Sequence, residues 1–416
     1  MSRSNLSNAL VNPDRLWISL MEMAKIGPGI AGGNNRQALT DEDAQGRRLF
    51  AKWCVEAGMS VAVDDMGNMF AQRDGSDGEA LPLYIGSDLD TQPTGGKYDG
   101  VLGVLAGLEV VRTLNDLRVR TRRPVVIANW TNEEGARFAP AMLGSGVFAG
   151  AIDKSAAHSK LDGEGRSFAG ELARTGWRGD EFCGSRQMHA YLELHIEQGP
   201  MLEARQVDVG VVTHCQGLRW IEFKMIGREA HTGSTPMNLR VNAGLAFARI
   251  AQAVEIIAAE TQPNSVGGIG QVNFHPNSRN VLPGQVVFTV DIRTVDASKL
   301  DYMEERVLAA AEETCRKLGV SHSYEIIGRT AAVTFSENLA DLVRRCSDNL
   351  HYSHIDIVSG AGHDACWISQ IAPTALIFCP CKGGISHNEA EDISMNWAMN
   401  GANVLLHSVL ELAEVA

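Results

Sequence analysis

Residues 83–107 read LYIGSDLDTQPTGGKYDGVLGVLAG, and this stretch decides the fold class. It begins with a short apolar strand at residues 83–87, passes through a turn at Gly95–Gly96, and continues as a helix of small and apolar residues from Gly100. Because helical segments separate this strand from later ones, the sequence predicts an α/β fold with helices on both faces of a mixed or parallel sheet. The later apolar strands are expected at residues 124–130, 191–195 and 374–378.

The middle of the chain has a different pattern. Residues 219–226 alternate between apolar and polar side chains, as a half-buried strand does. A long Ala-rich helix follows, and then two further strands and a second long helix, at residues 242–260, 267–274, 285–292 and 297–318. This order predicts a self-contained α+β domain at residues 215–329, inserted into a larger domain made of residues 1–214 and 330–416.

The composition excludes two classes of partner. The 416 residues contain 50 Asp and Glu against 37 Lys and Arg, a formal net charge of −13. A nucleic-acid-binding surface and an anionic membrane both require clustered basic residues, so we expect neither partner. The acidic surplus is either solvated surface or a set of carboxylates gathered around cations.

The spacing of the cysteines and the lengths of the apolar runs bear on the cellular compartment. Eight cysteines are scattered over a long chain, unlike the dense spacing of a disulfide-stabilised secreted domain. The first residues lack the pattern of a secretion signal. The sequence also contains no run of 18 apolar residues, the length that a membrane-spanning helix needs. We therefore expect a cytoplasmic protein with reduced thiols.

Carboxylates gather after the first apolar strand. Asp88 and Asp90 are two residues apart at its end, so both side chains point to the same side, and Asp99 follows the glycine turn. Three converging carboxylates repel one another unless a cation neutralises them. The alternative to a cation site, if this cluster is taken by itself, is an acidic loop exposed to solvent without a bound ion.

A second set of polar residues follows the other strands. Glu133 and Glu134 come directly after the strand at 124–130, where ligand sites of α/β sheets lie. Of two adjacent acids, one can bind a metal while the other transfers a proton. His195 ends the third strand and His387 lies in a loop after the fourth. The combined set offers ligands for two divalent ions that share one carboxylate, from Asp88, Asp99, Glu134, His195 and His387.

Eight motifs make the chain resemble a known family over nearly its whole length. They are GSDLDT with GGKYDGVLGV (86–104), NEEGARF (132–138), HIEQGP (195–200), HTGSTPM (231–237), PNSRN (276–280), DIR (291–293), SGAGHDA (359–365) and ISHN (385–388). The chain resembles the di-metal amidases of the aminoacylase/carboxypeptidase-type metallopeptidase clan, and within it the N-carbamoyl-L-amino-acid amidohydrolases of hydantoinase/carbamoylase type. This resemblance implies a mixed-sheet, metallopeptidase-like catalytic domain with an inserted lid and dimerisation domain.

The resemblance also implies a metal-ligand set. Asp99 would bridge two divalent ions, which could be Zn, Mn, Co or Ni. Glu134 and His387 would hold one ion, and His195 would hold the other together with residue 88.

The implied reaction removes the carbamoyl group of an N-carbamoyl-L-amino acid, giving the L-amino acid, ammonia and carbon dioxide. Glu133 would be the general base that activates the attacking water, and Asp90 would orient a ligand. N-carbamoyl-β-alanine and allantoate, the substrates of the related β-ureidopropionase and allantoate amidohydrolase, stay open as alternatives.

The substrate-binding residues implied by the resemblance lie mostly in the inserted domain. Arg293 and Asn280 would hold the substrate's α-carboxylate, the former through its guanidinium fork. His231, from the partner chain of a dimer, would stabilise the oxyanion. Gln198 and the backbone of Gly362 are further candidates for substrate contact. The strands and long helices of the inserted domain predict a homodimer formed through edge strands or helix faces.

Asp88 departs from the family pattern, which has a histidine ligand at this position. A carboxylate adds negative charge and hardness, so we expect weaker zinc binding and relatively better manganese or cobalt occupancy. Alternatively, the site has lost one ion, or the change weakens catalysis. In the last case the chain would be a metal-impaired relative that binds its ligand without hydrolysing it.

Overall fold

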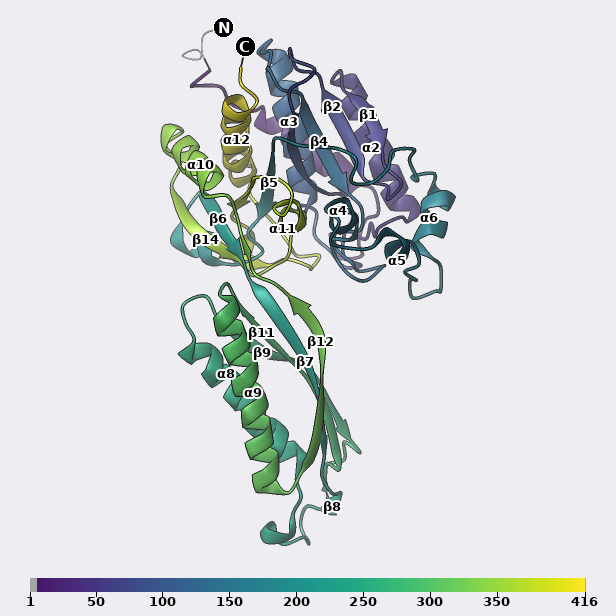
Figure 1. Cartoon of the computed structure of the whole chain (residues 1–416), viewed down its shortest axis with the longest axis vertical. Coiled ribbons are helices and arrows are strands. Elements are labelled where there is room, and N and C mark those ends of the chain that lie inside the picture. The colour runs from purple at the N-terminus through teal and green to yellow at the C-terminus, as the bar shows by residue number, and fades with distance from the viewer. Residues whose placement is uncertain (1–5, 416) are drawn as a thin grey trace. The chain divides into compact units, whose positions relative to one another are not determined.

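The structure is a computed structural model that describes residues 6–415. The described residues divide into two compact units (Figure 1). Unit 1 contains the chain up to Thr213, Phe335–Ile357, and the chain from Ala361 onward; unit 2 contains His214–Thr334 and Val358–Gly360. The insertion was predicted at residues 215–329, and unit 2 covers His214–Thr334 with Val358–Gly360.

A nine-stranded mixed sheet organises unit 1. Its order is β1 (Ser60–Val63), β2 (Met69–Arg73), β4 (Val125–Trp130), β3 (Leu83–Asp88), β5 (Ala190–Ile196), β15 (Thr374–Cys379), β6 (Val209–Cys215) and β13 (Val333–Thr334), with β14 (His354–Ser359) also paired to β6. The central strands β4, β3, β5 and β15 are parallel, and β2 and β6 flank them in the antiparallel sense. Every residue of these four central strands is buried, which explains why their sequences are mostly apolar.

Helices cover this sheet. The longer ones are α1 (Pro13–Ala24), α2 (Asp41–Glu56), α3 (Val101–Asp116), α10 (Glu337–Asn349) and α12 (Met395–Leu412). The shorter ones are α4 (Leu143–Phe148), α5 (Lys154–His158), α6 (Phe168–Thr175), α7 (Met201–Arg205), α11 (Asp364–Ile368) and the 3₁₀ turn η3 (Lys382–Gly384). The small residues of α3 let it approach the strands closely, since a Cβ on Gly103 would lie 2.4 Å from the carbonyl oxygen of Leu194. The α/β mixed-sheet prediction is therefore confirmed.

Unit 2 has its own sheet and core. Its four antiparallel strands run in the order β12 (Ser321–Thr330), β7 (Gly217–Ile226), β11 (Gln285–Thr294) and β9 (Val266–His275). The remaining elements are α8 (Ala243–Glu260), α9 (Ala297–Leu318), the ribbon of β8 (Ala230–His231) with β10 (Val281–Leu282), and the 3₁₀ turn η2 (Met237–Leu239). Alternate residues of the central strands face the helices, and Phe223 and Phe288 stack with ring centroids 5.3 Å apart.

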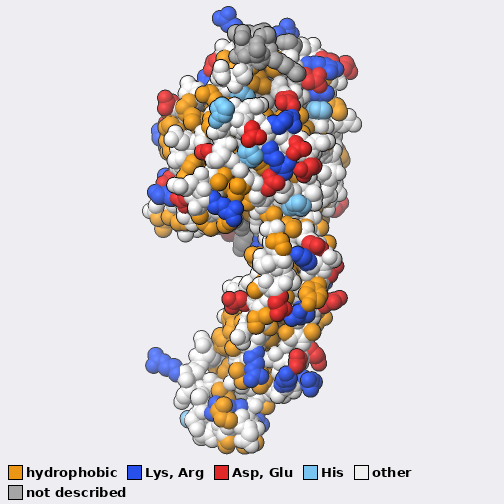
Figure 2. All heavy atoms as spheres, turned by 90° about the vertical axis from the view of Figure 1, so that its left-hand side faces the viewer, with side chains coloured by type: hydrophobic (Ala, Val, Ile, Leu, Met, Phe, Trp, Pro, Cys, Tyr) orange, Lys and Arg blue, Asp and Glu red, His pale blue; other side chains and the backbone are white. Residues whose placement is uncertain are grey.

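The surface carries charges of both signs. On the face shown in Figure 2, Lys and Arg side chains are interspersed with Asp and Glu side chains in both units. Ion pairs such as Arg344 with Asp356 and Arg329 with Glu304 are examples. Within residues 6–415, no helix is both long and apolar enough to cross a bilayer.

Candidate metal centre

The predicted site residues of unit 1 lie where the central parallel strands end. Because neighbouring parallel strands have their carboxyl ends at one edge of the sheet, side chains from β3, β4, β5 and the loop after β15 meet there. The predicted residues found at this edge are Asp88, Asp90, Asp99, Glu133, Glu134, His195 and His387.

One candidate ligand group consists of Asp99, Glu134 and His387, which we call the exposed group. The His387 Nε2 atom lies 3.3 Å from Glu134 Oε2 and 3.4 Å from Asp99 Oδ2. Ligand atoms about 2.0–2.1 Å from a tetrahedral ion are about 3.3 Å from one another, so these separations fit a divalent ion. The His387 side chain is 52% exposed, which leaves this ion position open to solvent.

His195 faces the other oxygen of Asp99. Its Nε2 atom lies 3.2 Å from Asp99 Oδ1, and its Nδ1–H donates to the carbonyl of Ile196 at 2.9 Å. The backbone bond puts the proton on Nδ1 and the lone pair on Nε2, which accepts the N–H of Gly100 at 3.2 Å and is the candidate ligand atom of this ring. Asp99 therefore offers one oxygen to His195 and the other to His387, the arrangement that a bridging carboxylate requires.

Two side chains that donate to Asp99 fix its orientation. Gln198 Nε2 donates to Asp99 Oδ2 at 3.0 Å, and Ser386 Oγ donates to the same oxygen at 2.7 Å. The structure thus places Gln198, predicted as a substrate contact, against the Asp99 carboxylate. Sequence reasoning missed Ser386, although it lies next to the predicted ligand His387.

Glu391 supports the same carboxylate through the backbone. It accepts hydrogen bonds from the backbone N–H groups of Tyr98 and Asp99 at 3.0 and 3.1 Å. A Cβ on Gly96 would lie 1.9 Å from the Glu391 carboxylate, so the second glycine of the predicted turn is required by this contact. Glu391 was not predicted, because nothing local to it in sequence shows its partners.

Asp90 holds the turn that carries the two glutamates. Its carboxylate accepts hydrogen bonds from the backbone N–H groups of Asn132, Glu133 and Glu134 at 2.9–3.3 Å. Asn132 has φ 60°, a conformation that non-glycine residues adopt only where their surroundings enforce it. Asp90 therefore supports this turn, and its role in orienting a ligand stays a prediction. Burial raises the pKa of Asp90 to about 7.

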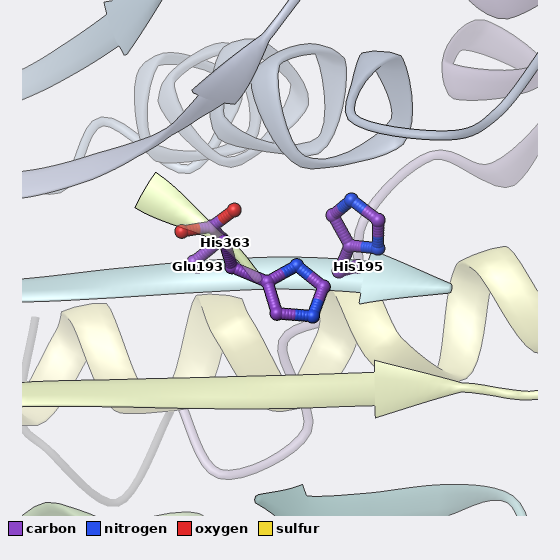
Figure 3. Close-up of side chains that lie close together, drawn as sticks. All are labelled: Glu193, His195 and His363. Carbon is purple, nitrogen blue, oxygen red and sulfur yellow. The ribbon is translucent and has the colours of Figure 1, made fainter. Parts of the chain in front are cut away.

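Asp88 is the predicted ligand that the structure does not bring into either candidate group. It is buried against Gly100, where a Cβ would lie 2.1 Å from Asp88 Oδ1, and Ser87 Oγ donates to it at 3.3 Å. Among the described residues, His195 instead forms a group with Glu193 and His363, which we call the buried group (Figure 3). Figure 3 shows Glu193 and His195 on one face of β5, with His363 beside them.

The crowding of carboxylates fits an ion-binding site. Burial raises the pKa values of Asp88, Glu133 and Glu134 well above their usual range. Neighbouring carboxylates add to this effect, chiefly Asp90 on Asp88, Asp88 on Glu133, and Asp99 on Glu134. Divalent cations placed among these groups would favour the charged forms and remove this penalty. The residues present therefore suit the implied ions.

The predicted substrate residues of unit 2 have partners within that unit. His231 Nδ1 accepts from the N–H groups of Gly233 and Ser234, both at 3.1 Å, so a neutral ring carries its proton on Nε2. The N–H of Thr232 donates to the carbonyl of Asn280 at 2.9 Å, which brings Asn280 next to this ribbon.

The guanidinium of Arg293 is partly occupied. Its Nε and Nη2 atoms donate to Asp291, and Nη1 donates to the carbonyl of Gly360 at 2.7 Å. Asp291 therefore holds the Nε–Nη2 edge of the guanidinium, which was predicted to bind the substrate's carboxylate. Along the Nη1–Nη2 edge, each nitrogen keeps one further N–H group for another acceptor. Gly362, the remaining predicted contact, is exposed in unit 1.

Comparisons with known proteins agree with this architecture. Residues 84–411 match the model of peptidase family M20/M25/M40. An N-carbamoyl-L-amino-acid amidohydrolase from Rhizobium meliloti is 64% identical over 408 residues, 98% of each chain. One from Geobacillus stearothermophilus is 36% identical over 97% of this chain and 100% of its own. A solved amidase of the hydantoinase/carbamoylase family from Burkholderia multivorans has a TM-score of 0.96 at 48% identity, covering 97% of this chain and 98% of that one. The resemblance predicted from the eight motifs is confirmed, and the chain belongs to peptidase family M20/M25/M40.

Proposed function

We propose that this chain is a metal-dependent amidohydrolase that removes the carbamoyl group from N-carbamoyl-L-amino acids. The observation that carries the proposal is Asp99, which offers one oxygen to His195 and the other to His387 beside a turn bearing two glutamates. The names of the similar proteins from Rhizobium meliloti and Geobacillus stearothermophilus support the choice of substrate class.

In this proposal the residues of unit 1 carry out the proton transfers. Two divalent ions, when bound by the groups around Asp99, would polarise the scissile carbonyl and neutralise the surrounding carboxylates. Glu133 takes the proton of the attacking water and returns it to the leaving amine. Asp90 keeps Glu133 in place by accepting the N–H groups of its turn.

The residues of unit 2 bind and orient the substrate. The remaining N–H groups of the Arg293 guanidinium and the Asn280 amide hold the α-carboxylate, and the Nε2–H of His231 stabilises the developing oxyanion. We further propose a homodimer in which the partner chain supplies His231, and a cytoplasmic location.

The test is turnover on a panel of purified substrates after reconstitution with Zn, Mn, Co or Ni. The panel contains the L and D forms of several N-carbamoyl amino acids, N-carbamoyl-β-alanine and allantoate. We expect the L forms to be hydrolysed with equal release of amino acid and ammonia, and the D forms to be unchanged. Faster turnover of N-carbamoyl-β-alanine or allantoate than of every L form would contradict the proposal.

Arg293→Lys tests the substrate-binding role separately. It keeps the charge but loses the fork, so we expect KM to rise about tenfold, the order of one lost charge-assisted hydrogen bond, with little change in kcat. Arg329→Lys, on the neighbouring part of the same sheet, is the matched control and leaves KM unchanged.

A further inference from the structure

The buried group of Glu193, His195 and His363 contains two side chains that the proposed mechanism does not use. Each of the three residues is at most 4% exposed. One possible ligand atom from each lies within 4.8 Å of the other two. Two imidazoles and one carboxylate form a donor set that first-row divalent ions favour.

The two histidine rings are placed as ligands of one ion would be. His195 uses Nδ1 for the carbonyl of Ile196, and Nε2, the nitrogen with the lone pair, accepts the N–H of Gly100 at 3.2 Å, a hydrogen bond that an ion at Nε2 would replace. The rings of His195 and His363 are T-shaped, with centroids 4.5 Å apart and planes at 70°. Two imidazoles on one tetrahedral ion have centroids about 5 Å apart, by the Zn–N distance and the ring size, so the observed separation is close to that of a shared ion.

Glu193 has capacity for one more partner. It accepts from Ser87 Oγ at 3.0 Å, Tyr191 OH at 3.1 Å and the N–H of Ala365 at 2.9 Å. An ionised carboxylate offers about four lone-pair positions, so these three donors leave one position. Figure 3 shows that Glu193 projects from the face of β5 that carries His195.

Asp88 does not complete this position. Its carboxylate packs against the backbone of Gly100, and among the described residues it belongs to neither candidate group. The chain thus has an aspartate at the position that the family pattern gives to a ligand, and a second buried histidine beside His195.

We propose that the ion bound by His195 is coordinated by His363 and Glu193, and that Asp88 is not its ligand. This inference rests on the proposed di-metal function but concerns only which residues hold one ion. It reverses the order of zinc and manganese expected from the sequence, because a site with two imidazoles favours Zn, Co or Ni over Mn.

The test is ion binding to the full chain without substrate. Wild type, His363→Gln and Asp88→Asn are stripped of metal, titrated with Zn²⁺ or Co²⁺ against a competing chelator, and analysed for bound ions by mass spectrometry. Substitution of residues that only support the ligands typically lowers metal affinity 10–100-fold. Because His363 is proposed to be a direct ligand, we expect His363→Gln to lower the affinity for one of the two ions about 100-fold or more. Asp88→Asn keeps both ions. His158→Gln is the matched control, since His158 contacts the carbonyl of Asp65 away from both groups.

A second measurement avoids the risk that a variant misfolds. X-ray absorption of the wild-type di-zinc form counts imidazoles, and the proposal requires three for two ions (His195, His363 and His387). A count of two, an unchanged affinity in folded His363→Gln, or loss of an ion in Asp88→Asn would each overturn it. Because no substrate is present, these results are independent of whether the chain hydrolyses N-carbamoyl amino acids.

Discussion

The buried and exposed ligand groups are built in different ways. His195 and Glu193 project from the central strand β5, and their hydrogen bonds reach the strands and helix around them. His387 lies in a loop at φ 52°, and Gln198, which contacts the same carboxylate, has φ 56°. The sheet thus fixes two members of the buried group, and His363 joins them from the start of α11, whereas loop contacts hold the exposed group in a conformation that the backbone alone disfavours.

This difference separates the effects of substitutions. A change in the loops around Asp99 should weaken the ion of the exposed group and leave the buried one in place. A change that removes proton transfer should leave both ions bound. Four predictions test this division.

The largest effect is expected for Glu133, which belongs to neither ligand group. Glu133→Gln removes the proposed base, and loss of general-base catalysis lowers kcat about 10²–10⁴-fold. Both ions should stay bound at wild-type affinity, as measured by chelator titration.

Glu181→Gln is the control for this experiment, because Glu181 pairs with Arg186 at 2.6 Å outside the site. Turnover of Glu133→Gln within a few-fold of wild type, with both ions bound, would show that another residue is the base.

The second prediction concerns the support of the exposed group. In Gly96→Ala the new methyl group displaces the Glu391 carboxylate from the N–H groups of Tyr98 and Asp99. We expect the fold to persist, since a flexible side chain can move, and the affinity of the exposed ion to fall about 10–100-fold. Gly78→Ala is the matched control, because a Cβ there meets no atom within 4 Å. Equal metal affinities in the two variants would mean that the hydrogen bonds of Glu391 do not support ion binding.

The sequence predicts most of this architecture because its strongest signals are local. The four central strands are short and rich in apolar residues, and the predicted ligands of unit 1 occur at or shortly after their carboxyl ends. The role of Asp90 in orienting a ligand came from the family resemblance and stays a prediction, while the structure shows Asp90 accepting hydrogen bonds from the Glu133–Glu134 turn.

The missed residues act over long sequence distances. Glu391 supports Tyr98 from almost the other end of the chain, and no periodicity of either segment indicates this contact. His363 meets His195 only because α11 and β5 are adjacent in the folded unit. The pairing of Arg293 with Asp291 is different, since residues two apart on a strand share a face, and this contact could have been predicted.

The third prediction uses the titration of the carboxylates. In the folded, metal-free protein the pKa of Asp90 is raised from 3.8 to about 7 and that of Glu391 from 4.5 to about 8, in both cases chiefly by burial. Between the pKa values of the unfolded and folded states, the two carboxyl groups therefore bind more protons in the folded state than in the unfolded state. The stability of metal-free protein should therefore fall as the pH rises from about 4 to 8.

Bound divalent ions stabilise the ionised carboxylates and should cancel this fall. The melting temperature is measured with added ions and with chelator between pH 5 and 8. The difference between these two melting temperatures, which we call the gap, should widen as the pH rises. Glu391→Gln should narrow the gap above pH 7. A gap that is the same at pH 5 and pH 8 would mean that these carboxylates are not coupled to the ions.

The smallest effect is expected for Ser386, which tests how far a single loop contact matters. Ser386→Ala removes the hydroxyl that donates to Asp99 Oδ2 at 2.7 Å, while Gln198 still donates to the same oxygen. One such bond is worth about 1 kcal/mol, so the exposed ion should bind about fivefold more weakly. Ser353→Ala removes a bond of equal length to Asp208 elsewhere in the unit and serves as the control. If Ser386→Ala weakened the ion at His195 as much as the ion at His387, the two groups would behave as one coupled site, and the division between sheet and loop would not hold.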